Sequence, residues 1–162
     1  MITLSGRTVI IALLLTLILV LPAGAVTIKS IRASVAENGD TTIVADYSLN
    51  WAEQAIAYPA ALPLVSAASG KNTRVVSISP GQTEIVSRKF ATVRQKPGAI
   101  TYSTPPFSLA DARRELDKYW FGDMITLDAG STLLTIVFPD GEMVQYRGLD
   151  SVPSFEHTVI RP

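Results

Sequence analysis

The sequence predicts an α+β fold, in which an antiparallel β-sheet of hairpins carries one or two helices on one face and follows an N-terminal apolar helix. Three observations predict it: apolar residues alternate with a period of two through most of the chain, turn-forming residues separate these stretches, and two stretches have helical spacing. Because strands and helices do not alternate, neighbouring strands should pair antiparallel. The alternative is a β-sandwich with decorating helices.

The first 25 residues have the pattern of an export signal peptide. Arg7 supplies a positive charge, residues 9–21 form an apolar run, Pro22 ends it, and residues 23–25 are small enough for a signal peptidase. We expect cleavage before Val26. The alternative is a retained membrane anchor, because residues 8–28 carry no charge and a membrane-spanning helix needs about 20 residues.

The remaining residues, 26–162, should form a single α+β domain. Removal of the 25-residue leader from the 162-residue chain leaves 137 residues, which is a common size for one domain. This part carries thirteen Lys and Arg against fourteen Asp and Glu, so bulk charge does not indicate a polyanionic partner, and nucleic acid is not expected. The chain has no cysteine, so an apolar core rather than disulfides must stabilise the fold.

The first elements expected after the leader are a hairpin and a short helix. Residues 27–49 alternate around Asn38-Gly39, a pair that favours a type I′ turn because both residues tolerate positive φ. Residues 50–57 should form a helix with Asn50 as its N-cap, ended by Tyr58-Pro59. Residues 59–70 are apolar and form either a second short helix or a loop. We expect this segment to cover the core rather than to contact a partner.

Residues 73–103 predict a meander of three strands at 74–79, 82–93 and 99–103, with turns at Pro80-Gly81 and Lys96-Pro97-Gly98. A helix should follow over residues 108–121, with Ser108 as its cap and an apolar stripe that faces the sheet. Further strands are expected at 124–127, 132–138 and 142–146, joined by hairpin turns, and an edge strand at 154–160.

The sequence offers little sign of catalysis, and we expect no enzyme activity, no cofactor and no metal site. The lone histidine, His157, has no cysteine or second imidazole to join it in a metal site, and it is expected on an edge strand or tail. A carboxylate-dependent hydrolase would need two convergent carboxylates. Turn formation explains the aspartates at predicted turns without a substrate, namely Asp123, Asp128, Asp140 and Asp150.

One stretch concentrates positive charge around an aromatic residue. Its candidate contacts with an anionic ligand are Arg88, Phe90, Arg94 and Lys96. On a continuous strand, residues 88, 90, 92 and 94 would share one face, which suits an anionic polysaccharide, a lipid headgroup or a nucleic acid. Basic residues also protect exposed strands from aggregation, and we favour such a solvated face over a binding patch.

Together these features predict an exported, non-catalytic module of the cell envelope or exterior, which acts by contact with a protein, a glycan or a membrane surface. One alternative is a membrane-anchored extracytoplasmic domain, held through residues 1–25, whose basic strand contacts an anionic surface. The other is the carboxylate-dependent hydrolase. A basic face on the same side as the leader would favour the anchored domain. No motif is specific enough to indicate a family.

Overall fold

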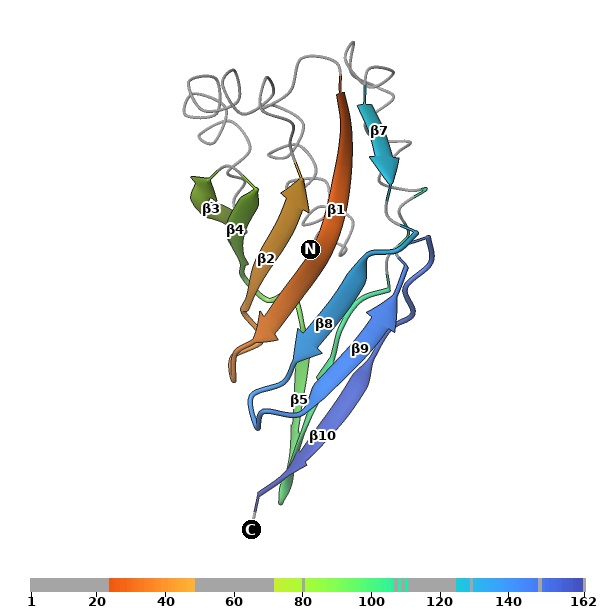
Figure 1. Cartoon of the computed structure of the whole chain (residues 1–162). Helices are drawn as coiled ribbons and strands as arrows, with labels where there is room; N and C mark the ends of the chain where they lie inside the picture. Colours follow the sequence, from red (N-terminus) through yellow and green to blue (C-terminus); the bar gives the residue numbers. More distant parts are fainter. Residues whose placement is uncertain are drawn as a thin grey trace.

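The described part of the chain is built from β-strands. A computed structural model of the chain describes residues 24–48, 72–79, 81–106, 108, 110, 125–128, 130–148 and 150–161, with only the backbone described at residues 24–27 and 125–128. Within these residues ten strands form two sheets (Figure 1). The strands are β1 (Gly24–Val35), β2 (Thr41–Ser48), β3 (Thr73–Ser79), β4 (Gln82–Ser87), β5 (Thr92–Lys96), β6 (Ala99–Ser103), β7 (Ile125–Asp128), β8 (Leu133–Val137), β9 (Met143–Arg147) and β10 (Glu156–Ile160).

The larger sheet has the order β3-β4-β2-β1-β8-β9, with β7 paired to the first part of β1. We call it the large sheet. The remaining strands form the small sheet, in the order β10-β6-β5. Buried side chains of both sheets belong to one hydrophobic cluster, to which the small sheet contributes Ile100 and Tyr102. The two sheets therefore share a core.

The prediction of an α+β fold with helices packed on one face of the sheet is wrong. No helix is present within the described residues, and the small sheet, rather than a helix, covers part of the large sheet. The residues predicted as a helix at 50–57 and as a covering segment at 59–70 lie outside the described part. The same is true of the helix predicted at 108–121, apart from residues 108 and 110.

The predicted antiparallel pairing is confirmed for six of the eight strand pairs within the described residues. The exceptions are β7 and β8, which both run parallel to β1. They lie one after the other along the same edge of β1, so β7 and β8 do not form the predicted hairpin. At the break between them, Thr132 Oγ1 donates a hydrogen bond of 2.7 Å to the Ile28 carbonyl. This bond satisfies a backbone acceptor next to the irregular register of β1 between Ile28 and Ser30.

The β1–β2 hairpin is confirmed, but its turn differs from the predicted type I′. Of the two residues Asn38 and Gly39, only Gly39 has a positive φ, of 83°. The Asn38 side chain forms hydrogen bonds of 3.0 Å with the amide and the carboxylate of Asp40. The loop is closed by the Gly39 amide, which donates to the Ala36 carbonyl at 2.9 Å. The Asn-Gly signal thus located the turn correctly and misjudged its geometry.

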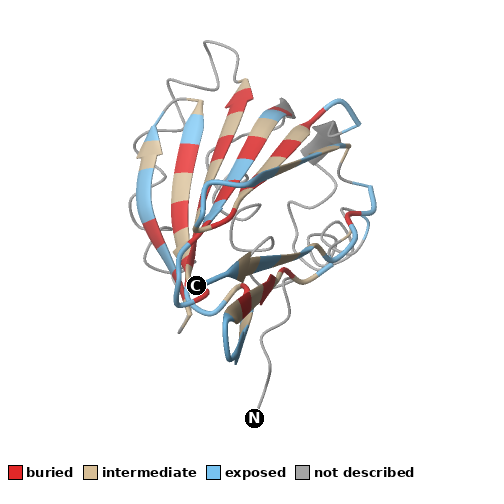
Figure 2. Ribbon diagram, turned by 90° about the horizontal axis from the view of Figure 1, so that it is seen from below, coloured by how far each residue is buried: buried red, intermediate tan, exposed pale blue. Residues whose placement is uncertain are grey.

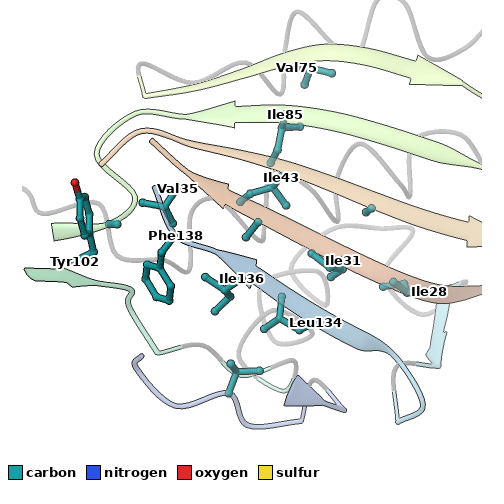
Figure 3. Close-up of a cluster of buried hydrophobic side chains, with 14 of the residues drawn as sticks. Ile28, Ile31, Val35, Ile43, Val75, Ile85, Tyr102, Leu134, Ile136 and Phe138 are labelled. Atoms are coloured by element: carbon teal, nitrogen blue, oxygen red, sulfur yellow. The ribbon is translucent and has the colours of Figure 1, made fainter. Parts of the chain in front are cut away.

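The core lies on the inner face of the large sheet, where alternate residues are buried. Strand β2 alternates strictly between buried and half-buried positions. Figure 2 shows buried positions recurring along several strands of the large sheet. Ile85 and Ala45 are fully buried near its centre. Figure 3 shows Tyr102 of the small sheet at the same end of this cluster as Val35 and Phe138. This end is where the two sheets meet.

Strand β1 begins at Gly24, two residues before the expected cleavage point, and pairs from that residue with β7. Residues 1–23 of the leader lie outside the described part. Within the described ranges, no helix has the length and apolar character needed to cross a membrane.

Candidate functional site

The structure divides the predicted basic strand into two segments. Strand β4 ends at Ser87, and Lys89 adopts a left-handed φ of 51° in the turn that follows. The Lys89 amide donates to Asp40 Oδ1 at 2.8 Å, and the Ala91 amide donates to the Gly39 carbonyl at 3.0 Å. The tip of the β1–β2 hairpin therefore holds this turn in place and directs the chain into the small sheet.

This break separates the four predicted contact residues. Arg88 is exposed in the turn, whereas Phe90 is half-buried and packs against the core. Phe90 therefore presents no aromatic platform beside Arg88. Only Arg94 and Lys96 lie together, both exposed on β5.

The strand register shows which residues share a face with Arg94 and Lys96. Residues directly opposite each other in an antiparallel pair point to the same side of the sheet. Arg94 pairs with Thr101, which pairs with Thr158, and the two threonine hydroxyls are 2.9 Å apart. The small-sheet outer face consists of three such rows: Thr92, Ser103 and Glu156; Arg94, Thr101 and Thr158; Lys96, Ala99 and Ile160.

The small-sheet outer face carries a local excess of positive charge. Arg94 and Lys96 form no ion pair within the described residues, and both remain exposed at the β5 edge. Their Cα atoms lie about 7 Å apart, since they are two residues apart on one strand. Glu156 is the single acidic residue among the nine, and it lies at the opposite corner of the face.

A second polar cluster lies between the sheets, where sequence reasoning expected no contact. His157 Nε2 of β10 is 2.7 Å from Asp140 Oδ2 in the β8–β9 turn, and the imidazole packs on the Phe138 ring with a centroid separation of 4.8 Å. The hydrogen bond with His157 is the main cause that lowers the pKa of Asp140. Asp140 Oδ1 also accepts from the Glu142 amide at 3.2 Å. Asp140 thus stabilises its own turn, as predicted, and also contacts the small sheet through His157.

Two more groups adjoin this cluster. Arg161, which follows β10, donates to Glu37 Oε1 at 3.1 Å and so reaches the β1–β2 hairpin tip. Tyr102 lies directly opposite His157 in the β6–β10 pair. Burial raises the pKa of the Tyr102 phenol, and the negative charges of Glu37 and Asp140 raise it further. The positive charge of Arg161 lowers this pKa in part. The groups of this cluster connect the end of the chain to the turns of the large sheet.

The other aspartates at predicted turns form no site in the described part. The side chains of Asp123 and Asp128 lie outside it, and Asp150 is exposed. Within the described residues, no group of three or more histidine or carboxylate side chains is arranged to hold a metal ion. His157 lies on the edge strand β10, which confirms its predicted location.

Comparison of the chain with protein-family models, curated proteins and solved structures finds no match. The geometry of its own residues is therefore the basis for a functional proposal. Sequence reasoning identified Arg94 and Lys96 but missed Thr101 and Thr158, which share their face. The period-two alternation of residues 99–103 and 156–160 could have placed both threonines opposite the apolar side chains.

Proposed function

We propose that this chain is an exported, non-catalytic module of the cell envelope or exterior, which acts by contact with another molecule. The observation that carries the proposal is the pattern of the leader, in which Arg7, the apolar run of residues 9–21, Pro22 and the small residues 23–25 follow one another. This order of charged, apolar and small residues is typical of the signal peptide of an exported protein.

The orientation of the body supports contact at the end away from the leader. Figure 1 places the start of β1 at one end of the molecule and the tips of β5 and β10 at the other. Strand β5, which carries Arg94 and Lys96, therefore extends away from the residue at which β1 begins. This arrangement argues against the alternative in which the basic strand touches the membrane that holds the leader.

A membrane-anchored form remains the second candidate, because only Pro22 and Ala23 separate the apolar run from β1. Such a form would present the small sheet away from the membrane. The hydrolase alternative has no comparable support. Asp140 is held by His157 and by the Glu142 amide, which gives its carboxylate a role in joining the sheets.

Cell fractionation of the full chain with a C-terminal tag tests the proposal. We expect a soluble product outside the cytoplasm that begins at Val26, whereas full-length protein in the cytoplasm would contradict export. A variant Leu15→Arg should block export, because a charge at the centre of an apolar helix costs about 3 kcal/mol on insertion. The matched control Ser5→Arg adds the same charge to the N-terminal region and should be exported normally. Full-length protein in the membrane would favour the anchored form.

A further inference from the structure

We propose, on the basis of the contact function above, that the small-sheet outer face binds an acidic polysaccharide. The ligand class is a sugar chain that carries carboxylate or sulfate groups. Three features of the face support this class: its unpaired cations, its central hydroxyl groups and its position in the molecule.

The cations supply the attraction. Arg94 and Lys96 extend from the same side of β5 and form no ion pair within the described residues, so both are available to a ligand. Anions placed along a polymer can meet both cations at once, and charge-assisted hydrogen bonds from Arg and Lys to carboxylate or sulfate are stronger than neutral ones. Glu156, at the far corner, leaves the β5 side of the face positive.

The hydroxyl groups suit a sugar chain. Thr101 lies at the centre of the face, between Arg94 of β5 and Thr158 of β10 in the middle row, and the two threonine hydroxyls are 2.9 Å apart. Ser103 lies on the neighbouring row, with its Oγ 3.5 Å from that of Ser154. Threonine and serine hydroxyls both donate and accept, so they can exchange these bonds for bonds to sugar hydroxyls. The short side chains of Thr101, Thr158 and Ser103 beside the cations also leave an extended polymer room to lie across the strands.

The same face fits the other anionic partners less well. Nucleic acid binding without sequence preference uses aromatic platforms, and Phe90 packs against the core instead of lying on this face. A membrane-docking surface inserts several apolar side chains, whereas Ile160 is the one large apolar residue among the nine. The small sheet also lies at the end opposite the start of β1 (Figure 1).

Binding of the chain recovered from expressing cells to defined polymers tests this proposal. We expect affinity electrophoresis at low salt to show retardation by polygalacturonate and dextran sulfate, and none by uncharged dextran. The double variant Arg94→Ser, Lys96→Ser should weaken binding roughly twofold to thirtyfold, the range for loss of two exposed ion pairs. The matched control Arg74→Ser, Arg147→Ser removes the same charge from exposed positions of the large sheet and should bind as tightly as the parent chain.

A second variant tests the role of the hydroxyls. Thr101→Val, Thr158→Val keeps β-branched side chains of similar size, so the sheet should be retained while binding weakens several-fold. An equal loss of polymer binding in the Arg94→Ser, Lys96→Ser variant and in its control would overturn the proposal. Stronger retention by anionic phospholipid vesicles than by either polymer would also overturn it. Export without polymer binding would contradict this inference alone. Polymer binding by a chain that is not exported would contradict the proposed function alone.

Discussion

His157 Nε2 and Asp140 Oδ2 lie 2.7 Å apart, and their contact joins the last strand of the small sheet to a turn of the large sheet. Near it, Arg161 reaches Glu37 in the β1–β2 turn of the large sheet at 3.1 Å. The end of the chain is thus attached to two turns that are distant in sequence. These contacts help to fix the orientation of the small sheet, and with it the direction in which Arg94 and Lys96 face.

Loss of the Asp140 carboxylate should destabilise the protein in a pH-dependent way. The pKa of Asp140 is lowered in the folded state, so its contribution is fully present above the unfolded pKa of about 3.9 and is lost as pH falls through the folded pKa. Asp140→Asn should therefore lower the urea midpoint at pH 7, and this difference should disappear towards pH 2. A difference that stays constant down to pH 2 would contradict the role assigned to the ionised carboxylate.

Gly39 should not tolerate a side chain. Its φ is 83°, and a Cβ atom there would lie 2.3 Å from the Ala91 carbonyl oxygen, which belongs to the backbone. We expect Gly39→Ala to cost more than about 2 kcal/mol in the free energy of unfolding, measured by urea titration. Gly141→Ala is the matched control, because its φ is 88° and nothing lies within 4 Å of the added Cβ. The control should cost only about 1 to 2 kcal/mol, and equal costs would contradict the docked hairpin tip.

The Tyr47 hydroxyl should stabilise the β2–β4 side of the large sheet. It donates to the Ser79 carbonyl at 3.0 Å and lies 3.2 Å from Thr83 Oγ1, which is buried. Tyr47→Phe removes both contacts and should cost about 1 to 3 kcal/mol in unfolding free energy.

Tyr47 should also make stability depend on alkaline pH. Burial raises the pKa of its phenol above the usual 10.0, so the contribution is present below about pH 10 and is lost as pH rises through the folded pKa. Urea titrations at pH 8 and pH 11 should show a smaller loss of stability for Tyr47→Phe than for the parent chain. The same loss in both would show that the phenol does not titrate as described.

Ile85 should contribute strongly to the hydrophobic core, because its side chain is 0% exposed. Ile85→Ala should lower the free energy of unfolding by about 2 to 5 kcal/mol through lost burial and the cavity left behind. Val76→Ala, at a position that is 50% exposed, should change it by no more than about 0.5 kcal/mol. Comparable costs at both positions would contradict the inner and outer faces assigned to the large sheet.

Local patterns in the sequence predicted the parts of the fold that local interactions determine. Asn38-Gly39 and Pro139-Asp140-Gly141 located two hairpin turns correctly, and period-two alternation located most strands. The division into two sheets was predicted only as the alternative, a β-sandwich, because it depends on contacts between distant residues, such as that of Asp40 with the Lys89 amide. The parallel course of β7 and β8 along β1 was missed for the same reason, since a turn-like sequence does not show which strand the chain will join.

The candidate site was predictable to a similar extent. Arg94 and Lys96 were identified because they belong to a local excess of positive charge, and their spacing of two places them on one face of a strand. Phe90 was misplaced because the strand ends at Ser87, where the tip of the β1–β2 hairpin docks. The contact between His157 and Asp140 could not be inferred, since it joins residues of different sheets.

Export of the chain is tested by the N-terminal sequence of tagged protein recovered outside the cytoplasm. We expect a single product that starts at Val26 and carries all residues that follow the leader. Recovery of the tagged protein solely in the cytoplasm, with Met1 and the apolar run still attached, would contradict it.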